Sequence, residues 1–371
     1  MRQLIVKPQI YKFNLCTEFV EAFPLTEKDL VLTNEYIYQP YFGALNLPCK
    51  VVYQENYGLG EPSDEMIDKI FNEIKDMDFN RVIAIGGGSV IDIAKLFVIK
   101  NAKNTLELFD KTIPMIKDKE LIIIPTTCGT GSEATNISIA EIKSKGTKMG
   151  LAIDELYADY AIIIPEMVKT LPYKFFVTSS IDALIHAVES FVSPKSNCYT
   201  ELFSLKAIEI IIKNYIQVIE KGEEYREELI EEFLIASNYA GIAFANTGVG
   251  AVHALSYPVG GTYHVPHGEV NYQFFVEVFK TYNRLNPNGK IIKLNNIIAE
   301  LIGTNVENVY DELEKLLNNL LPKKALKEYG MKEEEIEEFT SSVLEKQQRL
   351  LANNYTELSR DEIKGIFARL F

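Results

Sequence analysis

The hydrophobic positions of the chain follow different patterns in its two halves. In the first half, short apolar runs rich in Val and Ile predict strands at 30–33, 51–53, 81–85, 121–126 and 161–164. Helical spacing of apolar residues predicts helices at 63–76 and 90–100 between them, the first capped by Ser63. This alternation of strands and helices predicts a parallel sheet that is covered on both faces.

The second half shows helical periodicity and no convincing strand. Helices are predicted at 179–190, 199–220, 226–244, 295–302 and through the tail 332–371, where Ser359 is the expected cap of the last helix. A chain of 371 residues is longer than one hydrophobic core usually supports. We therefore expect an α/β domain at 1–178 and an all-α domain at 179–371.

Charge and cysteine content narrow the class of protein. The net charge of −14 opposes contact with nucleic acid or anionic membranes, so neither is expected as a partner. Four cysteines without a Cys-x-x-Cys pair argue against a disulfide framework and a structural zinc site, and favour a reducing compartment. No signal peptide or membrane-length apolar run is visible, which predicts a cytoplasmic protein.

The histidines are few and lie together in the helical half. Asp182 and His186 are four residues apart on a predicted helix, so both side chains emerge from one face. His253 and His267 would lie ~21 Å apart on one straight helix, too far to share an ion. The glycines and prolines between them, which are Pro258, Gly260, Gly261 and Pro266, are expected to break such a helix and let the chain turn back.

Two interpretations of these residues compete. An Asp-x-x-x-His pair on a helix is usually an ordinary surface or core pair, and a histidine in an apolar segment is usually a core residue. The grouping of all four histidines around helix breaks favours a metal site instead. Three imidazoles and one carboxylate suit Fe²⁺ or Zn²⁺ and leave a coordination position open for a substrate.

Two loops that follow predicted strands are candidates for binding a nucleotide. Gly86-Gly87-Gly88-Ser89 lies between a strand and a helix, where backbone amides and the helix N-terminus attract an anion, although a plain turn would look the same. The second loop, 125–134, carries four hydroxyl side chains that suit phosphate, ribose or carboxamide. These hydroxyls belong to Thr126, Thr127, Thr130 and Ser132. Its match to the G-x-G-x-x-A spacing is weak by itself.

The segments 86–95, 125–135, 182–189 and 250–268, in this order, resemble the iron-containing alcohol dehydrogenase family. The resemblance spans nearly the whole chain. It implies a Rossmann-like N-terminal domain for the nucleotide and an all-α C-terminal domain for the metal, a fold shared with dehydroquinate synthase. It also implies NAD and Fe²⁺ as cofactors, with NADP and Zn²⁺ as alternatives, and a homodimer by analogy.

The resemblance also assigns individual residues. The metal ligands it implies are Asp182, His186, His253 and His267. The pyrophosphate site it implies is Gly87, Gly88, Ser89 and Asp92; further cofactor contacts are Thr126, Thr127, Thr130, Ser132 and Lys148. Glu189, one turn beyond His186, is interpreted as a structural acid in preference to a partner of a metal ligand.

Three departures from the family pattern bear on catalysis and specificity. Tyr257 stands where the family commonly has a second histidine, so Tyr257 or His264 is expected to act beside His267 in catalysis. Asn34 occupies the position of an aspartate that many NAD-preferring members have, with Glu35 beside it. The frequent Asn-Pro-Arg near the C-terminus is here Asn353-Asn354-Tyr355, which suggests a different substrate pocket.

Within the family, the chain is similar to the clostridial-type NAD-dependent 4-hydroxybutyrate dehydrogenases at 57–64, 171–182 and 347–355. The resemblance implies hydride transfer between 4-hydroxybutyrate and succinate semialdehyde. The alternative is a broader primary-alcohol or diol dehydrogenase. A dehydroquinate-synthase-like lyase is less favoured because 250–270 lacks Lys and Arg, and a non-catalytic nucleotide-binding module is less favoured still.

Overall fold

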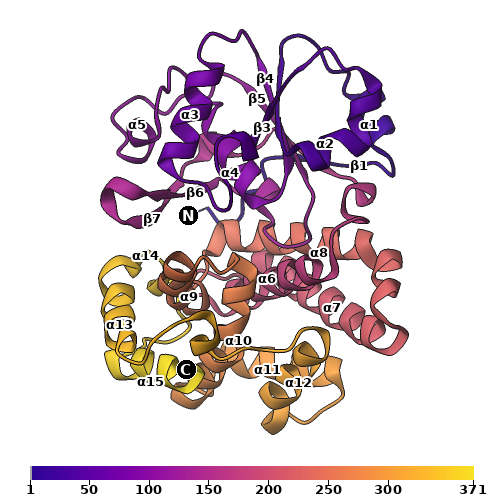
Figure 1. Ribbon diagram of the computed structural model, residues 1–371. Helices are drawn as coiled ribbons and strands as arrows, with labels where there is room; N and C mark the ends of the chain where they lie inside the picture. The colour runs from indigo at the N-terminus through magenta and orange to yellow at the C-terminus, as the bar shows by residue number, and fades with distance from the viewer. Residues whose placement is uncertain (1) are drawn as a thin grey trace. The chain divides into compact units, whose positions relative to one another are not determined.

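The computed structural model describes residues 2–371, which form two compact units (Figure 1). One unit is Val6–Leu171, and the other combines residues 2–5 with Pro172–Phe371. The division thus precedes helix α6 (Tyr173–Val192), whereas the sequence placed it after residue 178, inside that helix. Residue Ile5 joins the helical unit because its N–H and carbonyl both bond to the Asn246 amide.

The α/β unit is built on a six-stranded sheet in which every pairing is parallel. The strand order is β1-β8-β5-β4-β2-β3. The strands are β1 (Gln9–Lys12), β2 (Asp29–Thr33), β3 (Lys50–Tyr53), β4 (Arg81–Gly86), β5 (Glu120–Pro125) and β8 (Tyr160–Ile163). The five strands predicted from the sequence are all present. Strand β1 went unpredicted because its four residues are exposed, so no buried apolar run marks it.

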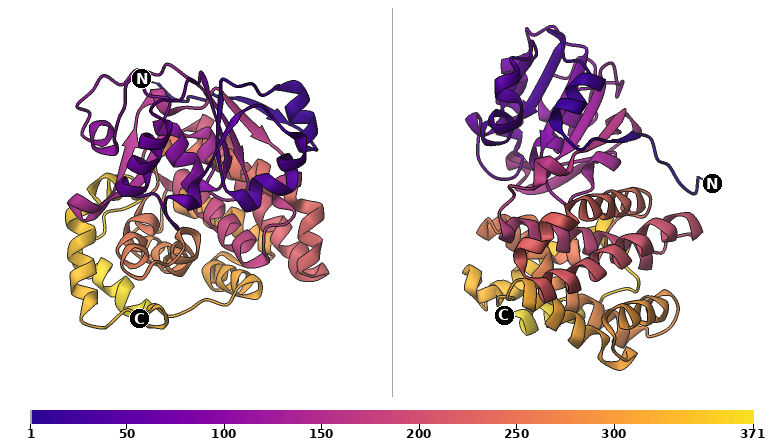
Figure 2. Two further views of the ribbon diagram at one scale, coloured as in Figure 1. Left: turned by 45° about the horizontal axis from the view of Figure 1, so that its top comes forward. Right: turned by 90° about the vertical axis from the view of Figure 1, so that its right-hand side faces the viewer.

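Helices cover both faces of this sheet (Figure 2). Helices α1 (Cys16–Ala22) and α2 (Glu35–Phe42) pack on the face that carries Val31. On the opposite face, which carries Leu30, lie α3 (Asp64–Ile74), α4 (Gly88–Leu96) and α5 (Thr105–Phe109). Consecutive strand residues point to opposite faces, and both faces are buried, which is why these strands read as unbroken apolar runs.

An antiparallel hairpin interrupts the alternation between β5 and β8. Strands β6 (Ile137–Ile142) and β7 (Thr147–Ala152) pair with each other and are separate from the main sheet. Buried residues alternate with half-buried or exposed ones in β6, and only Leu151 is buried in β7. Their apolar signal is therefore weak, and the sequence did not predict them.

The regular elements in the described part of the second unit are all helices, which confirms the predicted fold class. After α6 come α7 (Cys198–Lys221), α8 (Arg226–Thr247), α9 (Ala251–Tyr263), α10 (His267–Leu285), α11 (Lys290–Ile302), α12 (Val309–Leu320), α13 (Glu335–Lys346), α14 (Gln348–Leu351) and α15 (Arg360–Leu370). The Ser359 hydroxyl accepts a hydrogen bond from the Glu362 N–H, which confirms the predicted cap.

Helix α6 is the central helix of this unit and packs against α7, α8 and α10. It is the one helix among the described residues that is long and apolar enough to cross a membrane. However, 89% of its most apolar window is buried inside the structure. That burial is typical of the core helix of a soluble protein.

Of the four residues that were expected to break the helix between His253 and His267, only Pro266 lies at the break. Helix α9 continues through Pro258, Gly260 and Gly261 to Tyr263. Packing of its buried face compensates for the hydrogen bond that proline cannot donate. The chain turns only at 264–266, where His264 adopts a left-handed conformation with φ of 52°, and α10 begins at His267.

Candidate metal centre and nucleotide-binding turn

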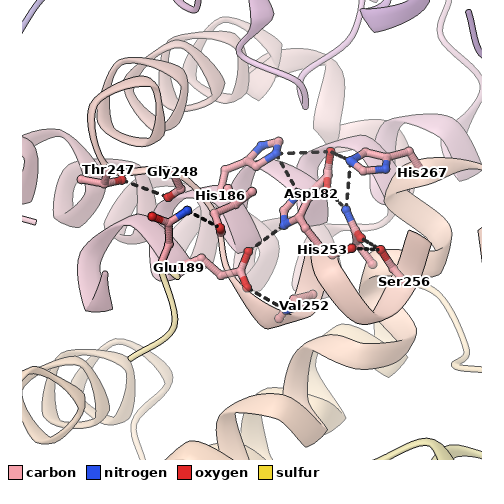
Figure 3. A network of polar contacts seen from close by, with 12 residues as sticks. Asp182, His186, Glu189, Thr247, Gly248, Val252, His253, Ser256 and His267 are labelled. Atoms are coloured by element: carbon pink, nitrogen blue, oxygen red, sulfur yellow. Dashed lines mark hydrogen bonds and ion pairs between the residues drawn. The ribbon is translucent and has the colours of Figure 1, made fainter. Parts of the chain in front are cut away.

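Three helices of the second unit bring the four predicted metal ligands together (Figure 3). Asp182 and His186 lie one turn apart on α6. His253 lies in the first turn of α9, and His267 is the first residue of α10. One potential donor atom from each of the four residues lies within 4.8 Å of the others.

The distances between these donor atoms suit a single divalent ion. The Nε2 atoms of His186 and His253 are 3.0 Å apart, and each imidazole has an Asp182 oxygen at 3.8 or 3.9 Å. In a tetrahedral site with bonds of about 2.1 Å, donor atoms lie roughly 3.4 Å apart. The observed spacings lie on both sides of that value, so these four side chains can surround one ion.

Glu189 orients His253 and is not merely a structural acid. Its Oε2 lies 2.6 Å from His253 Nδ1, and its Oε1 accepts the Val252 N–H at 2.8 Å. Burial lowers the pKa of His253, but the Glu189 and Asp182 carboxylates outweigh it, so that this pKa is raised. A proton held on Nδ1 by Glu189 leaves the Nε2 lone pair directed at the centre of the cluster (Figure 3).

Asn271 is a partner that the sequence analysis missed. Its Nδ2 donates to Asp182 Oδ1 at 2.8 Å and lies 3.1 Å from His267 Nε2, while Ser256 donates to its carbonyl oxygen. Burial raises the pKa of Asp182, but the three imidazoles and Asn271 together outweigh burial, so that this pKa lies below its ordinary value. The only available signal was position, because Asn271 is one helical turn after His267 on α10.

Of the two residues expected to act beside His267, Tyr257 lies near it and His264 does not. The Tyr257 ring is half-buried, and its centroid lies 6.2 Å from that of His267. His264 is exposed at the turn after α9 and lies outside the four-residue cluster. His267 itself has 34% of its side chain exposed, against 6% or less for the other three ligands. His267 is therefore the ligand at which the cluster is accessible to solvent.

A close approach between α6 and α10 positions His267. A Cβ atom on Gly268 would lie 2.4 Å from the Thr178 carbonyl oxygen and 3.4 Å from Asp182 Cβ. Only glycine allows the two backbones to approach so closely. The residue after His267 therefore controls how near this ligand comes to Asp182.

In the α/β unit, the predicted glycine turn lies at the carboxyl end of β4. Gly87 is the N-cap of α4, and the first N–H groups of this helix have no partner within the helix. A Cβ on Gly88 would lie 2.9 Å from the Thr130 methyl group, so the second loop packs directly on the turn. The Thr127 hydroxyl is buried and has no hydrogen-bond partner among the described residues. The turn and this hydroxyl fit a phosphate-bearing cofactor.

The remaining predicted cofactor residues differ in their surroundings. Ser89 is half-buried in the first turn of α4, and Thr126 is buried where its N–H bonds to the Gly86 carbonyl. Lys148, on the hairpin, forms an ion pair with Glu61. Asn34 follows β2 directly and is buried, with its amide bonded to Gln54 and Glu55.

A buried lysine, which the sequence analysis did not single out, braces the second loop. Lys95 Nζ donates to Ser132 Oγ at 2.6 Å, Thr135 Oγ1 at 3.0 Å and the Ile137 carbonyl at 2.7 Å. Burial lowers its pKa to about 8, although Asp92 acts in the opposite direction. A lone Lys among the apolar residues of α4 was the signal that could have found it.

Asp92 has a supporting position rather than one facing an anion. Its Oδ1 accepts the Ser132 hydroxyl at 2.9 Å and lies 3.8 Å from Lys95 Nζ, and its Oδ2 accepts the Ile139 N–H at 2.9 Å. Both Asp92 and Ser132 are therefore engaged in holding the loop and the hairpin to α4. Asp92 and Ser132 therefore support the loop that forms the predicted pyrophosphate site, through contacts with α4 and the hairpin.

Comparison with known proteins is consistent with both sites. The iron-containing alcohol dehydrogenase family model matches residues 16–165, and the C-terminal model of the Fe-containing alcohol dehydrogenase family matches residues 176–371. The chain belongs to the iron-containing alcohol dehydrogenase family. The family predicted from the sequence is thereby confirmed.

Individual relatives match most or all of the chain. It is 57% identical over 371 residues to the 4-hydroxybutyrate dehydrogenase of Clostridium kluyveri, covering 100% of both proteins. It is 32% identical over 327 residues to long-chain-alcohol dehydrogenase 1 of Geobacillus thermodenitrificans, covering 84% of this chain and 80% of that one. The sulfoacetaldehyde reductase of Bifidobacterium kashiwanohense, solved with NAD⁺, shares the fold, with a TM-score of 0.85 at 22% identity over 100% of this chain and 98% of that one.

The tight crossing at Gly268 predicts a strong effect of one methyl group. Gly268→Ala is expected to push α10 away from α6 and to weaken Fe²⁺ or Zn²⁺ binding roughly 10- to 100-fold. Metal titration of the purified variant measures this. Gly261→Ala is the matched control, since a Cβ there meets nothing within 4 Å. Metal affinity in Gly268→Ala equal to that of Gly261→Ala would contradict the role of the crossing.

The bracing role of Lys95 predicts a loss of stability. Lys95→Met leaves three buried acceptors and Asp92 without their cation, which is expected to lower the free energy of unfolding by about 2–4 kcal/mol. Urea denaturation followed by circular dichroism measures the change. Lys100→Met, in an exposed position just after α4, is expected to stay within about 0.5 kcal/mol of the unmodified protein. Equal stability of the two variants would show that Lys95 braces nothing.

Proposed function

We propose that this protein is a metal-dependent, NAD-linked alcohol dehydrogenase that interconverts 4-hydroxybutyrate and succinate semialdehyde. The convergence of Asp182, His186, His253 and His267 within 4.8 Å is the observation that carries the proposal. The full-length relative from Clostridium kluyveri, a 4-hydroxybutyrate dehydrogenase, supports this substrate over a general alcohol. Membership of an alcohol dehydrogenase family gives no support to a lyase or to a non-catalytic nucleotide-binding module.

The four residues are proposed to hold the divalent ion, with Fe²⁺ as the expected metal and Zn²⁺ as the alternative. The proposed nucleotide site is the turn 86–88 with the hydroxyls of the second loop and Lys148, and NAD is the expected coenzyme. When bound, these two groups polarise the substrate oxygen and exchange a hydride with its carbon. The homodimer and the cytoplasmic location stay predictions.

The residues of the metal centre divide the remaining work between them. Glu189 keeps the proton of His253 on Nδ1, and Asn271 holds Asp182 in place, so neither ligand reorients during turnover. The half-exposed His267 marks the side from which the substrate enters. Tyr257, beside His267, is the proposed carrier of the alcohol proton to solvent; the exposed His264 lies outside the cluster and is not needed for this step.

Arg349 is proposed as the cation that binds the substrate carboxylate. It is exposed on α14, which packs against α9, the helix of His253. The Asn353 amide ties the two segments together by donating to both the Val249 and the Arg349 carbonyls. The charge of Arg349 acts on His253, whose pKa it lowers against the larger effect of Glu189. No described acidic residue pairs with Arg349, whereas Lys174 is held by Glu269 at 2.7 Å.

An aldehyde panel tests the proposed reaction. Protein loaded with Fe²⁺ without air is expected to reduce succinate semialdehyde with NADH at a kcat/KM at least about tenfold above that for butanal, a difference that one charged contact supplies. His267→Ala is expected to abolish metal binding and turnover together, while His264→Ala keeps both. Similar kcat/KM values for the two aldehydes would reassign the protein to a broad alcohol or diol dehydrogenase, and activity in His267→Ala would refute the metal centre.

The role of Arg349 predicts a selective defect. Arg349→Gln is expected to raise KM for succinate semialdehyde roughly 10- to 100-fold, as the loss of a charged hydrogen bond would, and to leave butanal reduction unchanged. Lys346→Gln removes the same charge three residues earlier and serves as the control. An equal loss in both variants, or an equal loss for both aldehydes, would show that Arg349 does not contact the carboxylate.

A further inference from the structure

The coenzyme-facing edge of the sheet carries a carboxylate that the sequence analysis did not consider. Asn34 stands directly after β2, where an acid selects NAD in many relatives by resemblance. Glu55 is the second residue after β3, in a short 3₁₀ turn at Gln54–Asn56. In the register of the two strands, Thr33 pairs with Tyr53, so the residues that follow them leave the sheet side by side.

Hydrogen bonds fix the Glu55 carboxylate beside Asn34. Its Oε2 accepts the Asn34 Nδ2 at 2.8 Å, and its Oε1 accepts the Glu35 N–H at 2.7 Å. The Asn34 Nδ2 also donates to Gln54 Oε1 at 3.1 Å, and the Gln54 amide donates in turn to the Gly58 carbonyl. The side-chain oxygens of Gln54 and Glu55 both accept hydrogen bonds, so the end of the Asn34 amide that faces them must be its NH₂ group. The Asn34 amide therefore donates to the Glu55 carboxylate and holds it in position.

This carboxylate lies at the position of the sheet where ribose is recognised. Strand β2 pairs on one side with β4, whose carboxyl end is the glycine turn, and on the other side with β3. The chain order reverses between β2 and β4, and ligands of open parallel sheets bind at the carboxyl ends of strands at such a reversal. In nucleotide-binding sheets of this kind, an acid at the carboxyl end of the strand next to the glycine turn accepts hydrogen bonds from the adenosine ribose hydroxyls. That strand is β2, and the Glu55 carboxylate reaches its carboxyl end from β3 through the hydrogen bonds to Asn34 and the Glu35 N–H.

We infer that Glu55 supplies the carboxylate that position 34 lacks, and that it selects NAD over NADP by accepting the ribose 2′-hydroxyl. The amide of Asn34 and the N–H of Glu35 hold it in place. Among the described residues no Lys or Arg forms an ion pair with Glu55, so its charge is not compensated there. A 2′-phosphate at this point would lose the hydrogen bond and meet an unpaired negative charge. The inference depends on the nucleotide site of the proposed function.

Equilibrium binding tests this assignment without depending on catalysis. The intrinsic fluorescence of NADH and NADPH reports their dissociation constants with the metal-free full-length protein, compared across variants. Glu55→Gln keeps an acceptor for the Glu35 N–H but removes the charge. It is expected to weaken NADH binding several-fold, to strengthen NADPH binding, and so to reduce the preference for NADH at least about tenfold.

Glu35→Gln is the matched control because it removes a neighbouring carboxylate at the start of α2. Glu35 bonds to Glu55 only through its backbone N–H, which the substitution keeps. It is expected to leave the preference unchanged. A shift in Glu35→Gln that is absent from Glu55→Gln would assign selection to Glu35 and overturn the inference. An equal loss of both coenzymes in Glu55→Gln would reduce Glu55 to a structural support and overturn it as well.

Two further measurements keep the test sound if Glu55→Gln folds poorly. Glu55→Asp keeps the charge and is expected to keep rejecting NADPH. In the unmodified protein, raising the ionic strength from about 0.1 M to about 1 M screens the carboxylate and is expected to narrow the gap between NADH and NADPH. A gap that does not change with salt would overturn the inference. Binding of NADH without reduction of any aldehyde would refute the proposed function. The preference for NADH over NADPH could still be measured and would still test the role of Glu55.

Discussion

The close crossing of α6 and α10 at Gly268 is the constraint on which the metal centre depends. Asp182 and His186 are held on one buried helix, and their separation follows from helical geometry alone. His253 and His267 belong to different helices, so they reach Asp182 only because α10 restarts after the turn at 264–266 and meets α6 without a side chain between them. Backbone contact, rather than a flexible side chain, sets the position of the last ligand.

At this centre, two buried ligands, Asp182 and His253, each have a polar partner outside the cluster. A carboxylate or imidazole that is removed from water without a partner is costly, and the cluster contains an acid and two nearly inaccessible rings. Glu189 and Asn271 offset this cost and at the same time determine which ring nitrogen and which oxygen face the centre. In the other unit, Lys95 donates to three buried oxygen acceptors of the loop that packs on the glycine turn, and so holds that loop in place.

The sequence allowed the prediction of features that depend on local periodicity or on motif spacing. The five buried strands, the long helices of the second half and the ligand pair Asp182 and His186 all follow from patterns within about 20 residues. Strand β1 and the β6–β7 hairpin were not predicted because none of these strands has a continuous run of buried apolar residues. Pro266 lies at the predicted helix break, but Pro258, Gly260 and Gly261 do not interrupt α9, because tertiary packing holds this helix together, a contribution that a local rule omits. Asn271, Lys95 and Glu55 act through contacts across long stretches of chain, which spacing alone does not reveal.

The division of the chain between Leu171 and Pro172 has a consequence for how specificity is inherited. Every residue assigned here to the coenzyme precedes that junction, and every residue assigned to the metal or the aldehyde follows it. Coenzyme preference and substrate preference are therefore determined by residues of two separate, continuous segments of the chain. A single recombination between relatives at this junction would exchange one property and keep the other, so that the two can diversify independently.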